Sequence, residues 1–471
     1  MKKKKKNVNP QIMVITYLFT LAFMALIVYL CYFVQIQSDK VINNPYNKRQ
    51  ELLAKRVVRG SILSKDKEVL AKTVTDESGK ETRYYPYGAM FCHVVGRMEN
   101  SYTGIEQSKG FTMLNSSTNG LMQMIGQITG EKAVGDNVVT TLDTKLQEIA
   151  YEGLGSRKGA VVVMDPTTGK ILAMVSKPDY DPNKIAEQWD DLVEDKQEES
   201  ALINRATQGL YPPGSTFKTM TALAYIQQNK DTSGFHYDCG GQVTYGGNTI
   251  RCFQGEVHGD VNLKQAYAKS CNGAFATLGT RLDIQEFGRL CEKFLFNRSL
   301  PVDFEYNSSV FSLKKEDEVQ KVTHTSIGQG ETLISPLHNA MITAAIANNG
   351  VMMKPYVVDH VENVQGRTVS ENKPEKIKRV ISKAEAKKMQ KLMKAVVDSG
   401  TAVSLSGRDY TAAGKTGTAE YDSNGSSHAW FTGYASQGKT KIVVSIIVEG
   451  AGTGSTYAVP IAGKLFDAYL K

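Results

Sequence analysis

A run of 23 residues without a charged side chain, 12–34, constrains this chain more than any other feature. As a helix with a rise of ~1.5 Å per residue, the run is about 35 Å long, enough to cross a bilayer. A buried core helix is usually shorter and less uniformly apolar. A cleaved signal peptide has a shorter apolar region ending in small residues, whereas Gln35-Ile36-Gln37-Ser38 follows this run. The run therefore predicts a single transmembrane helix.

The charges around this run predict its orientation. Lys2 to Lys6 precede it, and Lys40 alone follows it closely. By the positive-inside rule, residues 1–11 form a basic cytoplasmic tail and the chain beyond about residue 35 lies outside the plasma membrane. Those five lysines supply five of the eight net positive charges, which leaves +3 for the rest. The remainder therefore gives no indication of a nucleic-acid surface.

Composition and cysteine spacing narrow the class further. With 41% hydrophobic and 22% charged residues, the 471-residue chain has the composition of packed domains. Six cysteines are too few for a disulfide scaffold, and no two stand in a C-x-x-C pair. No H-E-x-x-H motif occurs among the seven histidines. The sequence therefore predicts neither a metal site nor a cofactor.

Two units follow the apolar run. Residues 35–147 alternate short apolar runs with polar and glycine-rich stretches, which is typical of a small, loop-rich α+β unit. Apolar runs at 160–164 and 171–175 flank a turn sequence and predict a buried hairpin that opens a larger domain, 148–471. Ser382-Lys383-Ala384-Glu385 has the pattern of a capping box and predicts the start of a helix that ends at Gly400. Near the C-terminus, the β-branched run 441–448 predicts a strand, and residues 459–469 predict a short closing helix.

Ser215 and Lys218 have the spacing that activates a serine. A serine hydroxyl is a weak nucleophile and needs a base within hydrogen-bond reach, which a lysine one helical turn away supplies. Ser215 also follows a Pro-Pro-Gly turn at the start of a predicted helix, where free backbone N–H groups can stabilise an oxyanion. The spacing itself occurs five times, at Ser64/Lys67, Ser215/Lys218, Ser312/Lys315, Ser370/Lys373 and Ser436/Lys439.

Two further motifs follow in order. Ser270-Cys271-Asn272 is an S-x-N triplet, and Lys415-Thr416-Gly417 is the only K-T-G in the chain. Three such motifs in this order resemble those of the serine penicillin-recognising enzymes. The flanking residues are similar to those of class B penicillin-binding proteins, the monofunctional peptidoglycan transpeptidases, and the short N-terminal unit resembles the penicillin-binding protein A subgroup. The segments that carry this likeness are Arg59-Gly60-Ser61-Ile62, Tyr85-Pro86, His93–Gly96, Gly104-Ile105-Glu106, Asn204-Arg205-Ala206, Tyr211–Lys218 and Ser326–Gly330.

The resemblance implies an α+β architecture and a function. A transmembrane helix (12–34) would be followed by a pedestal domain of the dimerisation type (35–147) and by a transpeptidase domain (148–471) with an antiparallel sheet covered by helices. The enzyme would be a D,D-transpeptidase that cross-links peptidoglycan stem peptides through a serine acyl-enzyme and is acylated by β-lactam antibiotics. Since this class contains no polymerase, the resemblance also implies a SEDS-family glycosyltransferase as partner.

The resemblance also implies a role for each motif residue. Ser215 would be the nucleophile, Lys218 its base and Ser270 a proton relay. Asn272 would hold the substrate amide, and Lys415 would add positive charge near the substrate carboxylate. Thr416, Gly417 and Thr418 would border the substrate, with the backbone N–H groups of Ser215 and Thr418 forming the oxyanion hole.

Two other functions occur within the same serine family, that of a β-lactamase and that of a β-lactam sensor. A β-lactamase must activate water for deacylation, commonly through a glutamate, and no E-x-x-L-N run lies between Asn272 and Lys415. A β-lactam sensor needs an inward signalling module, for which a cytoplasmic tail of about eleven residues is too short. Both rivals fit the sequence less well than a transpeptidase does.

Cys239 and Cys252 flank a predicted hairpin outside the membrane. Facing cysteines at this position are compatible with a disulfide bond in an oxidising envelope and equally with two neighbouring reduced thiols. The sequence leaves both alternatives open.

Overall fold

A computed structural model describes residues 9–37, 41, 49–117, 132–195, 199–229, 231–420 and 427–471. Its N-terminal elements are α1 (Pro10–Tyr32), η1 (Phe33–Gln37), α3 (Arg49–Ala54), β1 (Val57–Val58), β2 (Ile62–Leu63), β3 (Val69–Thr75), β4 (Glu81–Tyr84), η2 (Gly88–Phe91), α4 (Cys92–Val95), α5 (Gly104–Ser108), α6 (Gly110–Met113), β5 (Ala133–Val134), β6 (Asn137–Thr140) and α8 (Thr144–Leu154).

The remaining elements are β7 (Gly159–Met164), β8 (Ile171–Lys177), α9 (Ile185–Glu194), η3 (Gly214–Phe217), α10 (Lys218–Gln228), β9 (His236–Cys239), β10 (Gln242–Tyr245), β11 (Asn248–Arg251), η4 (Phe253–Gly255), β12 (Gly259–Asn262), α11 (Leu263–Ala268), α12 (Asn272–Gly279), α13 (Ile284–Lys293), α14 (Val319–Ser326), α15 (Pro336–Ala347), β13 (Val351–Met353), β14 (Val358–Glu362), β15 (Thr368–Glu371), β16 (Lys376–Arg379), α16 (Lys383–Ser399), η5 (Val403–Leu405), β17 (Thr411–Glu420), β18 (Ser427–Gln437), β19 (Thr440–Val448) and α17 (Gly454–Leu470).

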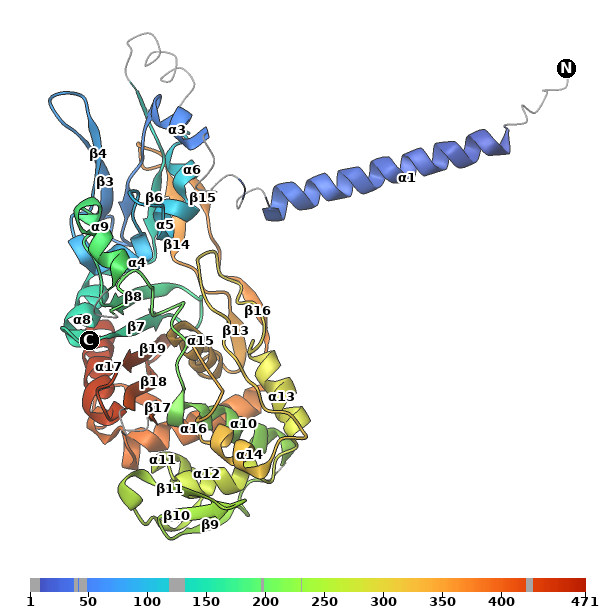
Figure 1. The fold of residues 1–471 in the computed structure, drawn as a ribbon, viewed down its shortest axis with the longest axis vertical. Helices are drawn as coiled ribbons and strands as arrows, with labels where there is room; N and C mark the ends of the chain where they lie inside the picture. Colours follow the sequence, from blue (N-terminus) through green and yellow to red (C-terminus); the bar gives the residue numbers. More distant parts are fainter. Residues whose placement is uncertain are drawn as a thin grey trace.

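The predicted transmembrane run forms α1, which continues into the π-helical turn η1. No residue of α1 is buried, and the helix projects from the body of the molecule (Figure 1). Within the part of the chain that the structure describes, it is the one helix long and apolar enough to cross a membrane. The hydroxyls of Thr16 and Thr20 donate to backbone carbonyls four residues earlier, so the helix satisfies its own polar side chains. Residues 1–8 of the basic tail lie outside the described residues.

The N-terminal unit is organised by a six-stranded sheet in the order β15-β14-β6-β2-β3-β4. Strands β14 and β15 come from residues beyond 350, and β14 pairs antiparallel with β6. The chain thus joins the N-terminal sheet after β7 and β8 and before β17, β18 and β19 of the C-terminal sheet. Two strands from the predicted unit 148–471 thus complete the sheet of the N-terminal unit.

A buried ion-pair cluster holds the N-terminal unit together. Glu106 accepts hydrogen bonds from Arg59 Nε at 2.8 Å and from Arg83 Nε at 2.6 Å. All three side chains are at most 5% exposed. Because a buried carboxylate requires compensation, the two guanidinium groups explain why Glu106 can lie in the interior.

The C-terminal unit is built on a five-stranded antiparallel sheet in the order β17-β18-β19-β7-β8. All six residues of β7 are buried, and so are residues 442–448 of β19. Because these strands are buried on both faces, other elements must cover each face of the sheet. Figure 1 shows the sheet between α17 and α15. The predicted α+β class, with helices covering an antiparallel sheet, is confirmed.

Local sequence patterns correctly predicted several helices and strands of the C-terminal unit. Ser382 and Glu385 form the predicted capping box at the start of α16. The hairpin β7–β8 and the strand β19 lie where apolar runs placed them. The closing helix α17 begins five residues earlier than predicted, at Gly454, and continues through Pro460.

Candidate active site

Ser215 lies in the 3₁₀ turn η3, which leads directly into α10. Gly214 has a φ of +50°, and its N–H donates to Gly328 O at 2.9 Å. A Cβ atom at Gly214 would lie 2.8 Å from Thr418 O. The glycine therefore allows the turn to approach strand β17 closely, and this approach brings Ser215 beside the third motif.

Lys218 is fully buried at the start of α10. Its Nζ donates to Asn272 Oδ1 at 2.6 Å, to Ser270 O at 2.7 Å and to Ser270 Oγ at 3.2 Å. Burial lowers the pKa of Lys218 to about 8, partly opposed by the neighbouring thiols of Cys271 and Cys252. A lysine with such a pKa is partly neutral near physiological pH and can accept a proton.

The second motif connects α11 to α12. Ser270 has a φ of +57° and ends the turn after α11, while Cys271 caps the N-terminus of α12. Asn272 is the first residue of α12, and its Nδ2 donates to Arg251 O at 2.8 Å. Asn272 is thus held from two sides, by Lys218 and by the end of β11. The structure brings the first and second motifs into direct contact, as the sequence predicts.

The third motif lies on β17, an edge strand of the five-stranded sheet. Lys415 is fully buried, and its Nζ donates to Thr416 O at 3.0 Å. Burial, followed by the positive charge of Lys218, holds the pKa of Lys415 well below its usual value. The positive charge of Lys218 therefore disfavours the protonated form of Lys415.

Gly417 is required by close packing between β17 and η3. A Cβ atom here would lie 2.9 Å from Trp430 Cβ, 3.1 Å from Thr216 Cγ2 and 3.2 Å from Pro213 O. The neighbouring Thr418 lines the cleft together with Ser215.

A cleft of about 730 Å³ opens at the meeting point of the three motifs. Ser215, Ser270, Asn272, Thr416 and Thr418 all line it. Other residues also line the cleft that no sequence motif indicated, among them Thr401, Thr453 and Ser455. Thr401 Oγ1 lies 2.5 Å from Thr416 Oγ1, but no local pattern marks Thr401, since the contact exists only after α16 has packed against β17.

Side-chain hydrogen bonds hold the segment that precedes Ser215 in place. Glu449 Oε1 accepts from Arg205 Nε at 2.8 Å and from the Tyr211 hydroxyl at 2.6 Å. Trp430 Nε1 donates to Pro212 O at 3.1 Å. The residues before Ser215 are therefore fixed to the sheet through side-chain hydrogen bonds.

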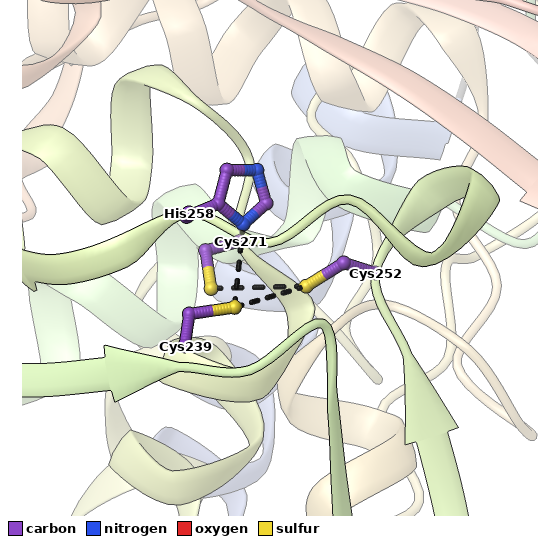
Figure 2. Close-up of side chains that lie close together, drawn as sticks. All are labelled: Cys239, Cys252, His258 and Cys271. Carbon is purple, nitrogen blue, oxygen red and sulfur yellow. Dashed lines mark hydrogen bonds between the residues drawn. The ribbon is translucent and has the colours of Figure 1, made fainter.

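The hairpin predicted between Cys239 and Cys252 is formed by β10 and β11. The two Sγ atoms lie 3.6 Å apart and both thiols are free (Figure 2). They are neighbours, as expected, but the distance exceeds the ~2.05 Å of a disulfide bond.

Comparison with known proteins agrees with this geometry. Residues 159–467 match the family model for the penicillin binding protein transpeptidase domain, and residues 59–138 match that for the penicillin binding protein A dimerisation domain. The peptidoglycan D,D-transpeptidase PbpA of Mycolicibacterium smegmatis is 31% identical over 467 residues, covering 92% of this chain and 93% of that protein.

Solved structures give the same result. The D,D-transpeptidase domain of a peptidoglycan glycosyltransferase from Eggerthella lenta has a TM-score of 0.79 at 30% identity, covering 88% of this chain and 98% of that one. Penicillin-binding protein A from M. tuberculosis, as its penicillin G acyl-enzyme complex, has a TM-score of 0.79 at 29% identity, covering 88% and 99%. With its three motifs around one cleft, the chain therefore belongs to the penicillin-binding protein transpeptidase family of serine acyltransferases.

Proposed function

We propose that this protein is a membrane-anchored D,D-transpeptidase that cross-links peptidoglycan stem peptides through an acyl-enzyme on Ser215. The observation that carries the proposal is the environment of Lys218, a buried amine bonded to both Ser270 and Asn272 one helical turn from Ser215. Relatives named peptidoglycan D,D-transpeptidase and acyl-enzyme structures of penicillin-binding protein A support it.

In the acylation step, Ser215 Oγ attacks the carbonyl carbon of the penultimate D-alanine. Neutral Lys218 accepts the hydroxyl proton, and the oxyanion receives hydrogen bonds from the backbone N–H groups of Ser215 and Thr418. The amide C–N bond then breaks. The leaving D-alanine takes a proton relayed through Ser270, and an ester on Ser215 remains.

The second step transfers the acyl group. An amine from a neighbouring stem peptide attacks the ester carbonyl, loses a proton and regenerates the Ser215 hydroxyl, so the cross-link forms without net hydrolysis. Asn272 holds the substrate amide, Lys415 supplies positive charge toward the substrate carboxylate, and Thr416 and Thr418 border the substrate along β17. A β-lactam enters the same step because its strained amide replaces the D-Ala-D-Ala bond.

The proposal includes a location and a domain division. Helix α1 anchors the protein in the plasma membrane with residues 1–11 in the cytoplasm and the cleft outside, in agreement with the lysines that precede the span. Residues 35–147 serve as a pedestal, and residues 148–471 carry the reaction. Class B penicillin-binding proteins contain no polymerase, and the resemblance to them supports a SEDS-family glycosyltransferase as the partner.

The acylation proposal is tested with the full-length protein in detergent and a fluorescent penicillin. We expect stoichiometric labelling of the wild type, mass-spectrometric placement of the adduct on Ser215, and no labelling of Ser215→Ala. Ser64→Ala, at another S-x-x-K, is the matched control and keeps full labelling. An adduct on a serine other than Ser215 contradicts the site, and rapid release of hydrolysed drug points to a β-lactamase instead.

The partner proposal needs its own test. A variant with residues 12–34 replaced by an unrelated span should keep penicillin labelling and lose copurification with the polymerase. Equal copurification of the two forms would rule out the span as the contact.

A further inference from the structure

Three cysteines and one histidine from separate segments meet beside the active-site cleft (Figure 2). Cys239 ends β9, Cys252 follows β11, His258 precedes β12, and Cys271 lies between Ser270 and Asn272. The three cysteines are at most 2% exposed, and the His258 side chain is 3% exposed. Their sulfur and nitrogen atoms all lie within 4.8 Å of one another.

The spacing of these atoms fits the edges of one tetrahedron. Cys239 Sγ lies 3.6 Å from Cys252 Sγ and 3.4 Å from Nδ1 of His258, and Cys252 Sγ lies 3.8 Å from Cys271 Sγ. Around a tetrahedral Zn²⁺, with Zn–S of about 2.3 Å and Zn–N of about 2.0–2.1 Å, neighbouring sulfurs are about 3.8 Å apart and sulfur and nitrogen about 3.5 Å apart. A disulfide would require about 2.05 Å between two of the sulfurs.

We propose that Cys239, Cys252, His258 and Cys271 bind one Zn²⁺ ion in a closed structural site. Three thiolates and one imidazole form a four-ligand set typical of structural zinc, and they leave no open position for a substrate or water. On binding, each thiol loses its proton to solvent and forms an S–Zn bond. No oxidant is needed, because neither the metal nor the sulfur changes oxidation state.

The surroundings of the ligands agree with metal binding. The N–H of Ala274 donates to Cys271 Sγ at 3.4 Å, as backbone amides do toward thiolates. When Nδ1 of His258 faces the thiols, Nε2 carries the proton. That Nε2 is buried without a hydrogen bond among the described residues, and Glu256 Oε2 lies 3.5 Å away. Zinc-binding histidines commonly orient their second nitrogen toward a carboxylate in this way.

The site would connect the hairpin to the second catalytic motif. Asn272 already contacts this hairpin through Arg251 O, and the ligands Cys271 and Cys252 are the chain neighbours of these two residues. A zinc ion would add a second link between the same two segments. The ligands have neither the C-x-x-C nor the H-E-x-x-H spacing, because four separate segments each supply one of them, and the sequence therefore predicted no metal site.

The test is metal analysis of the full-length protein, purified in detergent without chelator. We expect one zinc per chain in the wild type and at least tenfold less in Cys252→Ser and Cys271→Ser. Cys291→Ser, which removes a buried thiol outside the cluster, should keep its zinc. Ser215→Ala should also keep it, so loss of zinc and failure of the proposed acyl transfer are separable.

A second measurement on the wild type does not depend on whether the variants fold. A thiol-modifying reagent should release one zinc per chain, which a zinc-responsive dye detects. In a separate denatured sample without reductant, all six cysteines should be alkylated. Wild-type protein from native membranes that lacks zinc and has only four alkylatable cysteines overturns the site in favour of a disulfide. Zinc retained equally by Cys252→Ser and Cys271→Ser, or iron in place of zinc, overturns it as well.

Discussion

The Nζ atom of Lys218 donates a hydrogen bond of 2.6 Å to Oδ1 of Asn272, which joins the first catalytic motif to the second. Through Asn272 Nδ2 the contact extends to Arg251 O at the end of β11. The position of the base therefore depends on how the hairpin β10–β11 is held, and changes at Asn272 should affect the chemistry of Lys218.

The acylation rate should increase with pH as Lys218 loses its proton. Burial lowers the pKa of Lys218 to about 8, so the neutral, proton-accepting form is the minority below pH 8 and the majority above it. For one group with this pKa, the neutral fraction increases roughly fivefold between pH 7 and pH 8 and about tenfold between pH 7 and pH 9. Stopped-flow acylation with a chromogenic β-lactam measures this profile. A rate that is flat or falls over this range contradicts the role of Lys218 as base.

Asn272→Asp should move that profile to higher pH. The substitution keeps the shape of the side chain and places a negative charge where Oδ1 now lies 2.6 Å from Lys218 Nζ. An opposite charge at this distance favours the protonated amine and raises the pKa of Lys218, so acylation at pH 7 should fall. The control is Asn115→Asp, on the exposed surface of the N-terminal unit, which should leave the profile unchanged. An unshifted midpoint in Asn272→Asp would show that the two side chains are not coupled in solution.

Gly417→Ala should reduce acylation strongly. A Cβ atom at this position lies 2.9 Å from Trp430 Cβ and 3.2 Å from Pro213 O, so β17 and the Ser215 turn must move apart. A displacement of about 1 Å at a catalytic group can lower the rate roughly 10²-fold. Gly234→Ala, where an added Cβ meets nothing within 4 Å, should acylate normally. Equal second-order acylation constants for the two variants would contradict this account.

The sequence predicted what depends on local pattern. The capping box of α16, the hairpin β7–β8 and the three motifs each rest on residues close together in the chain. Lys218 also contacts Ser270 and Asn272 of the second motif, as expected from the order of the motifs and from flanking residues that resemble those of one enzyme family. The position of Ser215 follows from the short turn η3, which the Pro-Pro-Gly sequence before this serine predicts.

Features that depend on distant pairing were not predictable. Strand β14 joins the N-terminal sheet through β6, more than two hundred residues earlier, and nothing in its composition names that partner. Thr401 reaches Thr416 only because α16 packs on β17. The cysteine–histidine cluster likewise has one ligand per segment, so its members share no spacing that a motif search would find.

Glu106→Ala should strongly destabilise the N-terminal unit. The carboxylate is fully buried between Arg59 and Arg83, and its removal leaves two guanidinium groups in the interior without a counter-charge. Breaking a buried pair in this way typically costs about 3–5 kcal/mol, because the remaining charge has lost its solvation and its partner together. The matched control is Glu81→Ala. Glu81 pairs with Lys132 at 2.6 Å, but the two side chains are 22% and 37% exposed, so its loss should cost at most about 1 kcal/mol.

Thermal unfolding of the full-length variants, followed by circular dichroism, measures this difference. We expect Glu106→Ala to unfold at a clearly lower temperature than Glu81→Ala, while penicillin labelling of folded protein at low temperature is the same for both. The reason is that Glu106 contacts the N-terminal sheet and no residue of the cleft. Equal unfolding temperatures would mean that Arg59 and Arg83 find other partners or water when the carboxylate is gone, and that the cluster does not hold the unit together.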